Sequence, residues 1–116
     1  MAIPLCRLTD IPDGGARGFE LPQARLFAVR KNRTVYVYLN RCPHLGLPLE
    51  WERDNFLDTE GLYIRCANHG AFFALENGEC IQGPCQGDSL WAVDYRIDAG
   101  MIVIDPAELP AAHGPA

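Results

Sequence analysis

Two short runs organise this chain: Cys42-Pro43-His44-Leu45-Gly46 and Cys66-Ala67-Asn68-His69-Gly70. The second run repeats the order of the first, cysteine then histidine then glycine, in a chain that contains only 3 histidines. Thiolates and imidazoles placed this close together are typical metal ligands. The runs therefore predict a metal site whose ligands are the cysteine and the histidine of each run: Cys42, His44, Cys66 and His69.

Two cysteines and two histidines are compatible with two kinds of metal site. They can close a tetrahedral zinc site, or they can hold a [2Fe–2S] cluster with thiolates on one iron and imidazoles on the other. Zinc fingers usually place the two cysteines together and the two histidines together. Here each run mixes the two residue types. This mixture favours a binuclear cluster, because each loop can reach from one iron to the other.

Glycines and a proline near the runs also favour a cluster. Gly46 and Gly70 follow the two histidines, where a side chain would impede close approach of backbone N–H groups to cluster sulfides. Further along the chain, Gly83-Pro84 is placed to form a third loop over the same site.

At these residues the chain resembles the Rieske [2Fe–2S] proteins: Cys42-x-His44, Cys66-x-x-His69 and Gly83-Pro84 look like that family's pattern. The resemblance covers roughly residues 26 to 104. It implies that the two cysteines hold the inner iron as thiolates and that each histidine holds the outer iron through one ring nitrogen. It also implies stacked antiparallel sheets with a cluster-binding subdomain, at about residues 41–86, inserted into a larger β-core.

The resemblance also bears on the reduction potential. High-potential members of the family carry an extra cysteine in each ligand loop and a serine after the second His-Gly. The matching positions here are Leu47, Asn68 and Ala71. Without those groups, we expect a low-potential, ferredoxin-like cluster near the bottom of the Rieske range of about −150 to +300 mV.

Composition limits the remaining possibilities. A chain of 116 residues with 48% hydrophobic content is expected to form one domain, residues 1–116. The formal charge of −5, without a cluster of basic residues, argues against a nucleic-acid partner. The N-terminus has no basic start followed by an apolar stretch, and no apolar run approaches a membrane span. We therefore expect a soluble, cytoplasmic protein without a membrane partner.

Strand signals recur at short spacing, and no stretch shows helical periodicity, so the sequence predicts an all-β fold. The clearest strands are residues 26–30 and 34–39, with Val35, Val37 and Leu39 on one face and Tyr36 and Tyr38 on the other. The other expected segments are strands at 3–8, 62–65, 71–75, 80–81, 90–97 and 101–104, a polar turn at 9–18, a hairpin turn at Asn77-Gly78 and a tail at 106–116.

The segment between the two runs is rich in acidic residues, five of them between residues 50 and 60. Such a charge run is typical of a solvated loop, and the alternative is a docking surface for a basic partner. We expect Trp51 and Phe56 to anchor it.

The remaining cysteines are open to more than one interpretation. Cys6 suits a buried position. Cys80 and Cys85 have three possible roles: buried free thiols, the two halves of a local disulfide, or spare ligands.

Motifs of common enzymes are absent from the sequence: it has no G-x-G-x-x-G, no phosphate-binding loop and no H-E-x-x-H. The resemblance implies an electron carrier rather than an enzyme: a Rieske-type ferredoxin that takes electrons from a flavin-dependent reductase and gives them to an oxygenase or another oxidoreductase. Two alternatives remain. One is a small accessory subunit similar to that of assimilatory nitrite reductase, and the other is a zinc-stabilised structural module.

Overall fold

The computed structural model describes residues 2–41, 49, 54, 56–58, 60–66, 71–83 and 87–110. These residues form strands and two short 3-10 helices: β1 (Ile3–Arg7), η1 (Leu8–Asp10), β2 (Ala16–Glu20), β3 (Arg25–Lys31), β4 (Thr34–Leu39), β5 (Tyr63–Cys66), β6 (Ala71–Ala74), β7 (Cys80–Gln82), β8 (Arg96–Asp98), β9 (Met101–Ile104) and η2 (Pro106–Glu108). The expected all-β fold is confirmed. No helix in the described part of the chain is long and apolar enough to cross a membrane.

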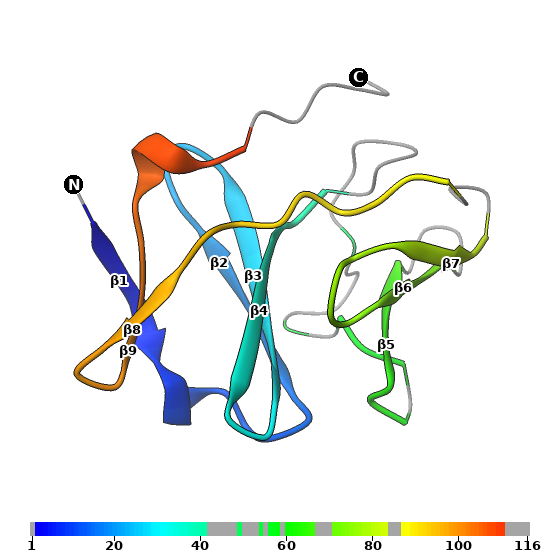
Figure 1. Cartoon of the computed structure of the whole chain (residues 1–116), viewed down its shortest axis with the longest axis horizontal. Helices are drawn as coiled ribbons and strands as arrows, with labels where there is room; N and C mark the ends of the chain where they lie inside the picture. Colours follow the sequence, from blue (N-terminus) through cyan, green and yellow to red (C-terminus); the bar gives the residue numbers. More distant parts are fainter. Residues whose placement is uncertain are drawn as a thin grey trace.

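The strands form three antiparallel sheets, ordered β1-β9-β8, β2-β3-β4 and β5-β6-β7. Figure 1 shows the β2-β3-β4 sheet between the other two. Side chains along a strand point alternately to opposite sides of the sheet. Both faces of the central sheet are buried, because each face packs against one of the two outer sheets. Along β4, Val35, Val37 and Leu39 enter one core, and Tyr38 enters the other with Tyr36 packed against it. The expected division of these five side chains is therefore confirmed.

One core lies between the central sheet and the β1-β9-β8 sheet, where Leu26 and Ala28 meet Ile102 and Ile104. The other lies between the central sheet and the β5-β6-β7 sheet, where Phe27 and Tyr38 share a cluster with other buried side chains that include Ile64, Cys66 and Phe73. Phe56 is fully buried and stacks on Phe27, with ring centroids 4.5 Å apart and planes 6° from parallel. The expected anchoring role of Phe56 is confirmed, while Trp51 lies outside the described residues.

Tight turns set the register of the hairpins. The β3–β4 turn has Asn32 at φ 59°, and the β8–β9 turn has Ala99 and Gly100 at φ 52° and 81°. In the β8–β9 turn, positive φ at both central residues gives a two-residue turn whose twist matches that of the flanking strands, whereas in the β3–β4 turn Asn32 alone of the two central residues has positive φ. The expected turn at Asn77-Gly78 is also present, with the N–H of Gly78 bonded to the carbonyl of Ala74 at 2.9 Å.

Three predicted boundaries were wrong. The expected polar turn at residues 9–18 instead contains the start of β2, because Ala16–Glu20 pairs along its whole length with β3. The first strand ends at Arg7, and Leu8 begins η1. The expected C-terminal tail contains η2, which Asp105 caps by accepting a hydrogen bond from the N–H of Ala107 at 3.0 Å.

The expected continuous strand at residues 90–97 was also wrong, since only Arg96–Asp98 forms β8. The N–H of Leu90 bonds to Gly78, the carbonyl of Trp91 accepts from Leu39, and the N–H of Val93 bonds to Val37. The segment therefore crosses from one outer sheet to the other along the edge of β4. The apolar positions of this segment do not stay buried toward β8: Tyr95, directly before β8, is 37% exposed, and Ile97 within β8 is 46% exposed.

Candidate metal centre

Among the four predicted ligands, Cys66 is the one that the structure describes. It is the last residue of β5, it is fully buried, and it pairs with Ala71, the first residue of β6. The cross-strand pair closes the segment 67–70, which contains His69. Cys42, His44 and His69 lie outside the described residues, so their roles remain predictions. Within the described residues no three His, Cys, Asp or Glu side chains form a metal-binding group.

The segment that contains Cys42 and His44 is closed by a buried hydrogen bond. The side-chain oxygen of Asn40 accepts from the backbone N–H of Leu49 at 2.8 Å, and both residues are buried. This bond holds the two ends of the ligand segment together across nine positions. The sequence signal for Asn40 was its place at the end of an apolar strand, directly before Arg41 and Cys42, but its role was not predicted.

The predicted third loop begins against the second one. A Cβ placed on Gly83 would lie 2.9 Å from both the Cα and the Cβ of Ala71, and Gly83 has φ +113°. Only a residue without a side chain permits this approach and this backbone conformation. Pro84 itself lies outside the described residues. The start of the third loop is thus packed on the residue that pairs with Cys66.

All three loops consequently leave from one region of the molecule. Leu49, Cys66 and Ala71 belong to the same buried cluster, and Gly83 contacts Ala71. The predicted ligands are attached to this region through short segments, which supports their convergence on one site.

Two arginines stand directly before the two predicted cysteine ligands, and the burial of their Nε atoms is unusual. The Nε atoms of Arg41 and Arg65 are buried without a hydrogen-bond partner among the residues that the structure describes. The guanidinium of Arg41 also lies over the ring of Trp91, 5.9 Å from its centroid. A buried N–H donor without a partner calls for a nearby acceptor. Thiolate and sulfide ligands provide negative charge, so the donor set and these arginines fit an iron–sulfur group.

Two of the three described acids of the segment between the runs serve the fold. Asp54 accepts a hydrogen bond from the backbone N–H of Gly18 at 2.8 Å, and Asp58 accepts from the N–H groups of Leu62 and Tyr63 at 2.8 and 3.1 Å. Asp54 therefore ties the segment to β2, and Asp58 closes the turn before β5.

Two other cysteines are described, and both suit buried structural positions. Burial raises the pKa of the Cys6 thiol, an effect that the charge of Arg17 opposes. A raised pKa keeps the thiol protonated and unreactive at neutral pH. Cys80 is also buried, and its Sγ donates to the carbonyl of Gln82 at 3.4 Å. Cys85 lies outside the described residues.

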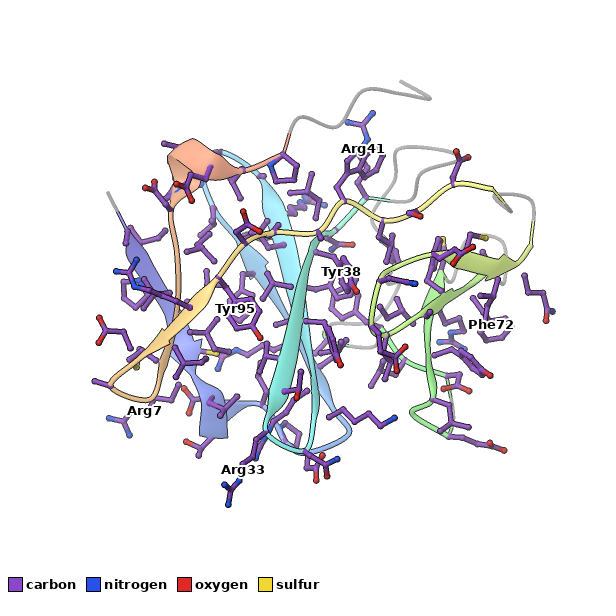
Figure 2. All side chains as sticks on the ribbon, in the orientation of Figure 1. Arg7, Arg33, Tyr38, Arg41, Phe72 and Tyr95 are labelled. Carbon is purple, nitrogen blue, oxygen red and sulfur yellow. The ribbon has the colours of Figure 1, made fainter. Side chains whose placement is uncertain are left out.

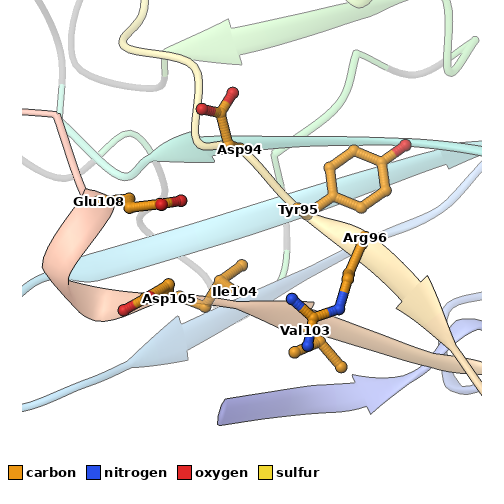
Figure 3. Close-up of a pocket in the computed structure, with 7 residues that line it drawn as sticks. All are labelled: Asp94, Tyr95, Arg96, Val103, Ile104, Asp105 and Glu108. Carbon is orange, nitrogen blue, oxygen red and sulfur yellow. The ribbon is translucent and has the colours of Figure 1, made fainter. Parts of the chain in front are cut away.

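Among the hollows formed by the described residues, two have different linings. One, of about 250 Å³, lies on the outer face of the β5-β6-β7 sheet between Tyr63, Phe72 and Ile81. Figure 2 shows Phe72 on this face, away from the central sheet. The other, of about 110 Å³, lies beside η2 and β8 and is lined by charged groups that include Asp94, Arg96 and Asp105 (Figure 3). The first hollow belongs to the sheet that carries Cys66, and the second belongs to the opposite sheet.

Comparison with known proteins agrees with this geometry. The family model described as the Rieske [2Fe-2S] domain matches residues 1–102. The ferredoxin of carbazole 1,9a-dioxygenase from Nocardioides aromaticivorans IC177 has a TM-score of 0.74 and 24% identity, covering 91% of this chain and 98% of that chain. The Sphingomonas yanoikuyae B1 ferredoxin has a TM-score of 0.71 and 24% identity, covering 90% and 98%. At these identities the structural likeness shows the fold.

Two further matches are a chain in a complex and part of a longer protein. A structure of the complex of reduced oxygenase and oxidized ferredoxin in carbazole 1,9a-dioxygenase has a TM-score of 0.74 and 21% identity, covering 95% of this chain and 96% of that chain. Apoptosis-inducing factor 3 of Mus musculus is 27% identical over 104 residues, which are 86% of this chain. The chain spans only 16% of the length of that mouse protein.

Proposed function

The chain belongs to the Rieske [2Fe-2S] domain family, and on that premise we propose that it is a one-electron carrier rather than an enzyme. It receives electrons from a flavin-dependent reductase and passes them to an oxygenase or another terminal oxidoreductase. The observation that carries this proposal is the meeting of three loop ends at Cys66: Leu49 shares its buried cluster, Ala71 pairs with it, and Gly83 contacts Ala71.

The cofactor is the Rieske-type [2Fe-2S] cluster, which takes up and gives up one electron at a time. We propose that Cys42 and Cys66 supply its thiolates and that His44 and His69 supply its imidazoles. The pairing of β5 with β6 fixes the backbone on both sides of the segment that contains His69. Asn40 does the same for the segment that contains Cys42 and His44, through its bond to Leu49. Complete burial keeps water away from Cys66.

The proposed partners rest on the similar structures and on the net charge of the chain. Two of the similar structures are ferredoxins, and a third contains a ferredoxin in complex with an oxygenase. The net charge of −5 would steer the chain toward a basic surface and would raise the association rate at low ionic strength. We further propose that the protein works in the cytoplasm, with neither nucleic acid nor membrane as a partner.

The match to a short part of the mouse protein favours one second candidate, an accessory module within a larger oxidoreductase assembly. Both candidates use the same cluster. They differ in whether the chain dissociates from its partner between turnovers, which size-exclusion chromatography of a native extract can distinguish.

The proposal is tested by spectroscopy of the protein purified without air, before and after dithionite reduction, together with iron and zinc analysis. We expect a coloured protein with about two irons per chain and a reduced electron paramagnetic resonance signal whose average g-value lies below that of all-cysteine clusters. A colourless protein with one zinc and no iron would overturn the proposal and leave a zinc-stabilised structural module.

A further inference from the structure

Arg41 and Arg65 share an environment that no other described residue has. Each stands directly before a cysteine that we propose as a ligand, and each has a buried Nε without a hydrogen-bond partner in the described part of the chain. Among the described residues, these two Nε atoms are the only buried side-chain nitrogen or oxygen atoms without a hydrogen-bond partner. The coincidence in both burial and sequence position points to a shared role at the metal centre.

Burying these two Nε atoms has a free-energy cost that the described residues do not offset. Arg41 and Arg65 are only partly buried as whole residues, but a buried N–H donor is unfavourable unless an acceptor compensates it. The described ion pairs use other arginines: Arg17 lies 3.9 Å from Asp10, and Arg25 lies 3.7 Å from Glu20. Arg41 and Arg65 form no ion pair with the described residues, and both stand next to the ligand loops in the sequence.

The strand geometry indicates how Arg65 acts. In β5 the side chains of Ile64 and Cys66 enter the core, and Arg65 between them faces the opposite side of the sheet with its cross-strand neighbour Phe72. Arg65 thus acts through its electric field rather than by contact with the Cys66 side chain. The guanidinium stands at the end of a long side chain on the opposite face, so its effect on the site is a longer-range Coulomb interaction.

Arg41 is held in place differently. It follows β4, and its guanidinium packs over Trp91, a half-buried residue on the segment that crosses from Leu90 toward β8. This cation–π contact fixes the charge at the start of the segment that contains Cys42 and His44. Each predicted cysteine ligand therefore has a permanently charged arginine as the residue before it.

We infer that Arg41 and Arg65 are electrostatic tuning residues that raise the reduction potential of the metal centre. The inference rests on the proposed function. Formally, two ferric ions, two sulfides, two thiolates and two neutral imidazoles sum to zero charge. One electron from the reductase makes the site −1, without making or breaking a bond. Fixed positive charges favour the −1 state over the neutral state, so they make the site easier to reduce.

The test is a potentiometric titration of the full chain with its cluster, followed by electron paramagnetic resonance. The variants are Arg41→Gln and Arg65→Gln, with Arg41→Lys and Arg65→Lys to retain the charge. Arg33→Gln is the matched control, because it removes the same charge at the far end of β4 from Arg41 (Figure 2). Since Arg33 is exposed, salt screens its charge.

We expect each glutamine variant to lower the equilibrium constant for reduction about three- to tenfold, which is about 30 to 60 mV at about 59 mV per tenfold for one electron. The lysine variants and Arg33→Gln should stay within about twofold of the unsubstituted protein, which is about 18 mV by the same conversion. The absorption spectrum should be unchanged throughout, since the ligands are retained.

The outcomes separate this inference from the proposed function. Glutamine variants that keep the cluster and the original potential would overturn the inference, and so would lysine variants that shift as far as the glutamine ones. If one glutamine variant fails to fold, the other decides, because Arg41 follows β4 and Arg65 lies in β5. Absence of a cluster from the unsubstituted protein would instead overturn the proposed function.

Discussion

The hydroxyl of Tyr38 donates a hydrogen bond to the backbone carbonyl of Leu75 at 2.6 Å, joining β4 to the residue after β6 across 37 positions of sequence. The ring of Tyr38 also lies against Gly78, where an added Cβ would come within 2.9 Å of it. Tyr38 therefore connects the central sheet to the sheet that carries Cys66.

Replacing Tyr38 by phenylalanine should lower the free energy of unfolding by about 1–2 kcal/mol, because the buried carbonyl of Leu75 loses its partner. Denaturant unfolding monitored by tryptophan fluorescence measures the change. Tyr36→Phe is the matched control on the same face of β4, since its hydroxyl makes no hydrogen bond to the described residues. Equal effects of the two substitutions would contradict the role of the Tyr38 hydroxyl.

The same residue predicts a dependence of stability on pH. Burial, reinforced by the neighbouring Tyr36 and Glu76, raises the pKa of Tyr38 well above the usual value for tyrosine. In the unfolded chain this tyrosine ionises near pH 10, so above that pH the unfolded state binds fewer protons than the folded state. The contribution of Tyr38 is therefore fully present below about pH 10 and is lost as the pH rises further.

We accordingly expect the free energy of unfolding to fall above about pH 10, with up to about 1.4 kcal/mol per pH unit coming from Tyr38. Tyr38→Phe should have a shallower slope in that range, and both proteins should have parallel profiles between about pH 7 and 9. Denaturant titrations across the range measure this. Identical slopes above pH 10 would show that another group is responsible.

The close packing of Gly83 on Ala71 predicts how a substitution of Gly83 changes stability and iron content. Gly83→Ala should disturb the start of the third loop, because its Cβ would meet the backbone and side chain of Ala71 at 2.9 Å. Gly87→Ala provides a close control: its φ is also positive, at +96°, but no atom lies within 4 Å of its added Cβ. Both variants carry backbone strain, and only Gly83→Ala adds the clash.

We expect Gly83→Ala to be destabilised by about 1–3 kcal/mol more than Gly87→Ala, and to hold less iron per chain. Thermal unfolding and iron analysis measure the two effects. If the variants lose stability and iron equally, the contact with Ala71 has no special importance for the site.

Features that depend on local pattern could be predicted from the sequence. The β3–β4 hairpin was predicted because β-branched and aromatic residues alternate in β4, and both of its faces proved to be buried. The strand into Cys66 was predicted for the same reason. The ligand assignment came from spacing and resemblance, and the structure describes only Cys66 of the four predicted ligands.

Contacts between residues far apart in sequence could not be predicted. Nothing near Asn40 or Asp54 indicates that they bind the backbone N–H groups of Leu49 and Gly18. The predicted strand at residues 90–97 failed for a related reason. Its apolar positions alternate, but its hydrogen bonds go to Gly78 and to the edge of β4 rather than along one strand partner.

Cys66 and Cys80 allow the ligand assignment to be tested with similar substitutions. Both are buried cysteines in the β5-β6-β7 sheet, but only Cys66 adjoins a predicted ligand loop. Cys66→Ser should lose the visible absorption and most of its iron, because the site loses one of its two thiolates. Cys80→Ser should keep both, with a modest loss of stability. Retention of the spectrum by Cys66→Ser, or its loss in Cys80→Ser, would contradict the assignment.

Ala71 offers the final prediction, about the low potential expected for this site. Ala71 is fully buried and pairs with Cys66. The resemblance described above matches it to the serine of high-potential members of the family. A hydroxyl there would add a hydrogen-bond donor beside the site and favour its more negative, reduced state. Ala71→Ser should therefore raise the equilibrium constant for reduction about tenfold, which raises the reduction potential by about 59 mV for one electron.

Ala74→Ser makes the same chemical change three residues further along β6 and should leave the potential unaltered. The prediction is wrong if Ala71→Ser keeps an intact cluster at the original potential, since the missing hydroxyl would then have no part in setting it.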